Sequence, residues 1–182
     1  MYELTIFKNQ FDNKTHRKVS FDSWDSFRGL LLDLSKKEGH KGGGNSSPLI
    51  TPACFQEGST RSNKSTTHWG GWCAVDVDDF MVGVRVHEIE QNLRERFGQY
   101  NYIVYSTASS REDHLKFRIV FELDEHIENE RIKALWYALN TELGEMGDPQ
   151  TKDLARMYYV PAQYPDAYSF FFHNDGNSLN TS

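Results

Sequence analysis

The chain has 182 residues, of which 38% are hydrophobic and 25% charged, values that are ordinary for a single globular domain. Its net charge of −6 argues against a protein that coats nucleic acid through bulk positive charge. The presence of only two cysteines argues against a disulfide-framed secreted scaffold, and no apolar run approaches the roughly 20 residues of a membrane span. We therefore expect a soluble, cytoplasmic protein without a membrane partner.

The amino-terminal part of the chain predicts a strand, a helix and a loop. Residues 2–8 alternate between polar and apolar side chains, as a strand does. A helix is expected to begin after Asp22 or Ser23 and to reach about residue 37, because its apolar residues recur at helical spacing. Residues 39–48 contain three consecutive glycines and predict a flexible loop.

The rest of the chain predicts five strands and two helices. The strands are expected at 73–77, 101–106, 116–123, 155–160 and 167–173. The helices are expected at 84–97, closed by Gly98, and at about 127–143. Residues 174–182 are polar and predict a frayed tail. This order indicates an α+β fold in which helices pack on a mixed or antiparallel sheet, as a single domain over 1–182.

A pair of carboxylates at the end of a strand is the strongest local signal. Asp76 and Asp78 stand two residues apart, so both side chains project from the same face. Carboxylates this close repel each other unless a cation or a proton lies between them, and such oxygen ligands suit Mg²⁺ or Mn²⁺. The alternative is that acidic residues simply end a strand and enter solvent.

Two further groups of polar residues follow. His114, Lys116 and Arg118 alternate along a strand and can grip a triphosphate, although the solvent face of an amphipathic strand has the same pattern. Asp148 precedes a proline in a turn, and Asp153 and Arg156 follow it.

Taken together and in this order, the three groups resemble the motifs of the archaeo-eukaryotic primase superfamily, in particular its phage and plasmid primase-polymerase branch. Residues 75–78 resemble the first motif. The second motif is usually a tight Ser-x-His, whereas His114 stands four residues after Ser110 here, which resembles the variant in which Lys116 and Arg118 carry the load. The third motif is matched by Asp148, Thr151, Asp153, Arg156 and Pro161. The resemblance covers roughly residues 48–161.

This resemblance implies an RRM-like catalytic core and a nucleotidyltransferase that synthesises primers on single-stranded DNA from nucleoside triphosphates during phage- or plasmid-type DNA replication. Two Mg²⁺ or Mn²⁺ ions would be held by Asp76, Asp78 and Asp148. The triphosphate would be bound by His114, Lys116, Arg118 and Arg156, with Ser110 and Asp153 in support. A replicative helicase, in cis or in trans, and a bacterial or archaeal host cell are also implied.

The basic segment 36–64 offers Lys41, Arg61 and Lys64 for binding DNA, unless it is only a solvated loop. Two other classes of function remain open. A metal-dependent nuclease would use the same carboxylates to cleave a phosphodiester. A non-catalytic nucleic-acid-binding module of a replication initiator would leave them structural.

The two cysteines raise the question of zinc. Cys54, His68 and Cys73 are 14 and then 5 residues apart, which matches no compact zinc knuckle. We therefore expect no zinc, and we expect Cys73 to lie in the core on the strand that carries Asp76.

Overall fold

The computed structural model describes residues 1–80 and 83–182, and they form the α+β fold that the sequence predicts. The central sheet has the order β11-β7-β8-β6, and each neighbouring pair in it is antiparallel. Its strands are β6 (Trp72–Val77), β7 (Tyr102–Ser106), β8 (Phe117–Glu122) and β11 (Phe171–Asn174).

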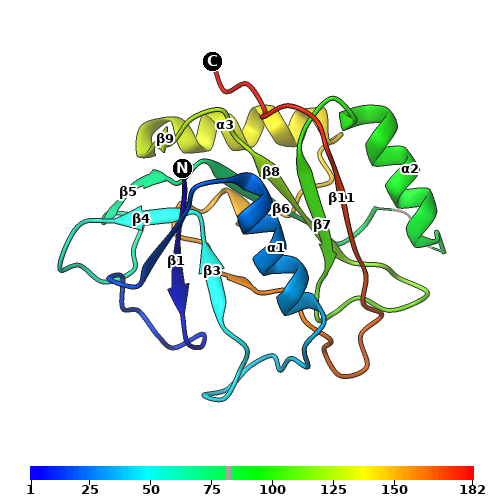
Figure 1. Ribbon diagram of the computed structural model, residues 1–182, viewed down its shortest axis with the longest axis horizontal. Coiled ribbons are helices and arrows are strands. Elements are labelled where there is room, and N and C mark those ends of the chain that lie inside the picture. Colours follow the sequence, from blue (N-terminus) through cyan, green and yellow to red (C-terminus); the bar gives the residue numbers. More distant parts are fainter. Residues whose placement is uncertain (81–82) are drawn as a thin grey trace.

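Two smaller sheets lie beside the central one (Figure 1). The first has the order β10-β3-β1-β2 and consists of β1 (Tyr2–Phe7), β2 (Lys18–Phe21), β3 (Leu49–Thr51) and β10 (Tyr158–Tyr159). The second has the order β4-β5-β9 and consists of β4 (Ala53–Phe55), β5 (Thr66–Trp69) and β9 (Ile127–Glu128).

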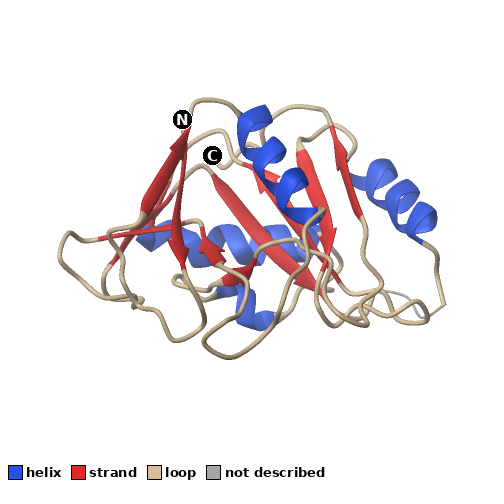
Figure 2. Ribbon diagram, turned by 60° about the horizontal axis from the view of Figure 1, so that its bottom comes forward, coloured by secondary structure: helices blue, strands red, loops and turns tan. Residues whose placement is uncertain are grey.

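Both faces of the central sheet are covered (Figure 2). Helices α2 (Val86–Phe97) and α3 (Asn129–Glu142) pack on one face, where Val75 and Val77 of β6 point into a shared apolar cluster. Helix α1 (Trp24–Ser35) and the first small sheet pack on the other face, where Trp72 and Ala74 point. Because side chains alternate along β6, Asp76 lies on the α1 side.

The structure confirms the main expected elements and shows where the sequence pattern was incomplete. Strands β2, β3, β4, β5 and β9 were not expected; each is two to four residues long, too short for a clear period. The strand expected at 155–160 is reduced to β10, because the amide of Arg156 donates to the carbonyl of Asp153 in a turn. No helix in the described part of the chain has the length and apolar character needed to cross a bilayer.

The carboxyl-terminal tail differs from the frayed segment that was expected. It runs alongside α3 (Figure 1), where Arg131 donates to the carbonyl of Thr181 at 2.7 Å. The backbone of Leu179 also makes two hydrogen bonds near the end of β8. Its amide donates to the carbonyl of Glu122 at 2.8 Å, and its carbonyl accepts from the amide of Asp124 at 3.1 Å. These backbone hydrogen bonds hold the tail against the rest of the protein, and its polar composition alone does not predict them.

Candidate active site

A cavity of about 420 Å³ opens where the ends of β6 and β7 and the start of β8 meet the first small sheet. The loop at 107–109 and the segment around the short 3₁₀ helix Pro149–Lys152 complete its wall. Nine of the residues singled out in the sequence line this cavity: Lys41, Arg61, Asp76, Asp78, Lys116, Arg118, Asp148, Asp153 and Arg156. Side chains from segments more than 100 residues apart in the chain thus meet in one place.

Asp76 and Arg118 form a buried ion pair at the base of the cavity. They are register partners on β6 and β8, and the guanidinium donates to both carboxylate oxygens, Nε to Oδ1 at 2.5 Å and Nη2 to Oδ2 at 3.1 Å. The third nitrogen, Nη1, donates to the hydroxyl of Tyr105 and the carbonyl of Tyr159. Burial alone would lower the pKa of Arg118, but the charge of Asp76 and the Tyr105 oxygen raise it above its ordinary value.

This pairing gives Arg118 a partner within the protein. The guanidinium also lies over the ring of Tyr158, with Cζ 4.6 Å from the ring centroid. Since every guanidinium nitrogen of Arg118 has at least one partner within the protein, its geometry is that of a residue that positions Asp76. Its expected role as a phosphate ligand remains a prediction.

Asp78 lies just past the end of β6 and faces several like charges. Burial raises the pKa of its carboxyl, Asp76 and Asp148 raise it further, and Lys116 opposes the rise. The ionised form of Asp78 is therefore disfavoured in the folded protein. A cation bound nearby would offset the repulsion from the neighbouring acids and stabilise the ionised form.

Asp148 reaches the other two acids through backbone pairing. Its amide donates to the carbonyl of Asp76 at 2.8 Å, and Gly147 forms a bridge with Val77 that extends the edge of the central sheet. Only glycine fits at position 147, because a Cβ there would lie 2.5 Å from Asn140 Oδ1 and 2.7 Å from Val75 Cγ1. The close approach of the turn to β6 thus depends on Gly147.

The buried side chain of Thr151 stabilises the turn that carries Asp148. The hydroxyl of Thr151 donates to the carbonyl of Asp148 at 2.6 Å and accepts from the indole nitrogen of Trp136 on α3 at 2.9 Å. The side chain of Asp148 caps the 3₁₀ helix by accepting from the amide of Gln150. The third motif therefore places its acid through hydrogen bonds that involve its threonine.

Four cations line the cavity without an acidic partner. Within the described residues, Lys41, Arg61, Lys116 and Arg156 form no ion pair with a carboxylate. Arg156 donates instead to Gln150 Oε1 at 3.0 Å, and its contact with Asp153 is only between backbone atoms. Acids and unpaired cations therefore share one cavity, an arrangement suited to a phosphate group accompanied by metal ions.

Three of the predicted site residues do not line the cavity. Nε2 of His114 donates to the carbonyl of Asp78 at 2.7 Å, so this side chain holds the loop after β6. Ser110 is fully buried, and its hydroxyl accepts from the amide of Lys116 at 3.3 Å. Lys64 is exposed on the loop before β5.

Several residues that line the cavity were not expected from the sequence. Tyr105, Tyr159 and Tyr164 form part of its wall, and the hydroxyl of Tyr159 accepts from the amide of Gly42 at 2.9 Å. The glycine-rich loop is thus held against the cavity at this point. Aromatic residues on strands are common in cores, so their sequence positions carry no signal for a site.

The three acids provide hard oxygen ligands that fit Mg²⁺ or Mn²⁺. They are spread more widely than a closed metal cage: among the described residues, the group whose ligand atoms all lie within 4.8 Å of one another is a different one, Glu3, Cys54 and His68. Asp76 is at the same time paired with Arg118. Each carboxylate oxygen of Asp76 keeps a lone pair besides the one that Arg118 occupies.

The comparisons with known proteins concern the fold. No protein-family model and no curated protein matches this sequence. Among solved structures, the chain is similar to the AEP domain of the primase-polymerase (PrimPol) of cyanophage S-2L, with a TM-score of 0.52 and 10% sequence identity. The match covers 99% of this chain and 84% of that domain. The described residues therefore have the fold of an AEP primase domain.

Proposed function

We propose that the chain is a DNA-template-dependent nucleotidyltransferase, a primase or primase-polymerase. The observation that carries the proposal is the cavity in which Asp76, Asp78 and Asp148 face unpaired cations at the end of the central sheet. The shared fold with a phage primase-polymerase domain and the order of the three motifs support the same activity.

The acids and the cations have separate roles in this proposal. Divalent ions bound by the three acids would lower the pKa of the attacking 3′-hydroxyl and stabilise the leaving pyrophosphate. Asp78 and Asp148 present carboxylates to the cavity, while Arg118 fixes the orientation of Asp76. Lys116 and Arg156 bind the triphosphate, and Lys41 and Arg61 at the same cavity bind the template or the nucleotide.

A primer-synthesis assay tests the proposal directly. The full chain is incubated with single-stranded DNA, labelled nucleoside triphosphates and Mg²⁺ or Mn²⁺, and we expect metal-dependent labelled oligonucleotides whose sequence follows the template. Release of nucleotides from labelled DNA without added triphosphates would instead identify a nuclease. Absence of both products, with DNA binding intact, would identify a non-catalytic module.

Lys116 offers the sharpest test of the triphosphate site, because it lines the cavity and has no acidic partner among the described residues. Hydrogen bonds to charged groups contribute about 1.5–3 kcal/mol, and 1.4 kcal/mol corresponds to about tenfold in affinity. We expect Lys116→Met to weaken the binding of a non-hydrolysable nucleotide about 10- to 100-fold, as measured by calorimetric titration with Mn²⁺ present.

The matched control is Lys133→Met, which removes an exposed lysine on α3, outside the cavity. Nucleotide affinity should be unchanged in this control. Equal affinities for Lys116→Met and the wild type would mean that Lys116 does not contact the triphosphate.

A further inference from the structure

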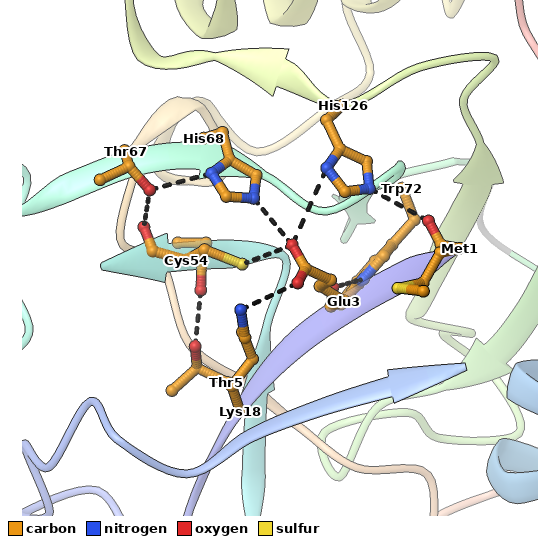
Figure 3. A network of polar contacts seen from close by, with 10 residues as sticks. Met1, Glu3, Thr5, Lys18, Cys54, Thr67, His68, Trp72 and His126 are labelled. Carbon is orange, nitrogen blue, oxygen red and sulfur yellow. Dashed lines mark hydrogen bonds and ion pairs between the residues drawn. The ribbon is translucent and has the colours of Figure 1, made fainter. Parts of the chain in front are cut away.

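A second cluster of ligand-type side chains lies outside the cavity (Figure 3). Glu3 of β1, Cys54 of β4 and His68 of β5 bring one carboxylate oxygen, one sulfur and one imidazole nitrogen within 4.8 Å of one another. His126, the residue immediately before β9, adds a second imidazole, with Nδ1 3.8 Å from the Glu3 oxygen Oε2. Three side chains therefore converge on a single carboxylate oxygen.

In each histidine, the ring nitrogen that points away from Glu3 makes its own hydrogen bond. This bond determines whether the nitrogen that faces Glu3 carries a proton. Nε2 of His126 lies 3.0 Å from the carbonyl of Met1, which can only accept, so Nε2 carries the proton. The hydroxyl of Thr67 donates to the carbonyl of Cys54, so it accepts from Nδ1 of His68, 2.9 Å away. In the neutral rings, the nitrogens that face Glu3 therefore carry lone pairs.

With both histidines neutral, no proton or cation lies between these lone pairs and the Glu3 carboxylate. Nε2 of His68 lies 2.8 Å from Glu3 Oε2, so two acceptors face each other at hydrogen-bond distance. Lys18 does not resolve the conflict, because its ammonium pairs with the other oxygen, Oε1, at 2.9 Å. Either extra protons or one cation must lie among the acceptors. Partners that fix the outer nitrogen of each histidine are the usual surroundings of metal-binding imidazoles.

The ligand set identifies the class of cation. A thiolate, two imidazoles and a carboxylate suit Zn²⁺, whereas Mg²⁺ and Mn²⁺ prefer oxygen ligands. Zinc–ligand distances of about 2.0–2.3 Å place tetrahedral ligands about 3.3–3.8 Å apart. The distances from Glu3 Oε2 are 2.8 Å to His68 Nε2, 3.6 Å to Cys54 Sγ and 3.8 Å to His126 Nδ1, close to this range, so small side-chain shifts would form such a site. The cluster is also close to solvent, since 23% of the His68 side chain and 38% of the His126 side chain are exposed.

We propose that Glu3, Cys54, His68 and His126 form a structural zinc site. The site would tie β1 to β4, β5 and the segment that leads into β9, and so join the two small sheets. It revises the expectation that the protein holds no zinc. In this proposal the sequence spacing carries no signal, because two of the four ligands, Glu3 and His126, lie far from Cys54 in the chain, and because Cys73 belongs to the core. The proposal does not rest on the proposed function.

Cobalt provides the test, because Co²⁺ replaces Zn²⁺ and reports its ligands spectroscopically. Full-length protein stripped with a chelator is titrated with Co²⁺. We expect one equivalent to produce a near-ultraviolet thiolate-to-cobalt charge-transfer band and strong visible bands of four-coordinate cobalt. Zn²⁺ should abolish both, and excess Mg²⁺ should not. Zinc at 100 times its dissociation constant should raise the melting temperature of the stripped protein by about 5–10 °C.

Variants connect the signal to the cluster. Cys54→Ala should remove the charge-transfer band, and His126→Gln should weaken cobalt binding about tenfold or more. Cys73→Ala and Asp78→Asn, which leave the cluster intact, should retain the band. Wild-type protein that gives no thiolate band at millimolar Co²⁺ would overturn the proposal, whether or not any variant folds. A band that persists in Cys54→Ala would also overturn it, and protonated histidines would then supply the missing charge.

Discussion

Asp78→Asn is expected to lower primer synthesis by at least about 10²–10³-fold while leaving the protein as stable as the wild type or more stable. Loss of activity follows because an amide is a poor ligand for a divalent ion. The gain in stability follows because burial, Asp76 and Asp148 hold the pKa of Asp78 above its ordinary value. A carboxyl whose pKa is raised by folding costs stability when ionised, and this cost disappears as the pH falls through the raised pKa.

Primer synthesis and thermal melting of the two proteins, each measured over a range of pH, check this prediction. The difference in melting temperature should be largest at neutral pH and should shrink in acid, where Asp78 of the wild type is protonated. Asp79→Asn is the matched control, since the Asp79 side chain is 89% exposed and lies outside the cavity. Near-normal primer synthesis by Asp78→Asn would show that Asp78 is not a ligand of the metal ions.

In contrast to Asp78→Asn, Arg118→Met should lower the stability of the folded protein. The substitution leaves the buried carboxylate of Asp76 without its two hydrogen bonds, and removing one member of a buried pair costs about 3–5 kcal/mol. For a protein of this size, that cost corresponds to a fall in melting temperature of about 6–20 °C. Thermal melting at neutral pH measures the effect.

A double variant separates the ion pair from packing. Adding Asp76→Leu to Arg118→Met removes the unpaired charge, so the double variant should recover much of the lost stability. Lys116→Met, a neighbouring cavity variant without a broken ion pair, should melt within a few degrees of the wild type. If Arg118→Met changes the melting temperature little and weakens nucleotide binding, Arg118 binds the triphosphate rather than stabilising Asp76.

The sequence predicts the elements of the central sheet well and the small sheets poorly. Strand β6 is a run of residues buried on both faces of the sheet, and the three helices have clear apolar periods because each buries one face. Strands β3 and β4 contain three residues each, and their order is set by pairing with distant strands. No pattern within three residues carries that information.

The candidate site shows a similar division. The acids and cations that meet in the cavity were identified from local patterns and from the order of the motifs. The pairing of Arg118 with Asp76 was not, because it depends on the register between β6 and β8. The convergence of Glu3, Cys54 and His68 depends in the same way on the pairing of strands that are far apart in the chain.

The contact between Arg118 and the carbonyl of Tyr159 has a consequence for how the molecule can be divided. Tyr159 belongs to β10, which pairs with β3, and β3 pairs with β1 at the start of the chain. A fragment limited to the motif-bearing residues 48–161 would lack β1 and α1 and would expose Trp72 and Ala74 to water. The ion pair of Asp76 and Arg118 therefore lies between segments that only the longer polypeptide brings together, and we do not expect residues 48–161 to fold on their own.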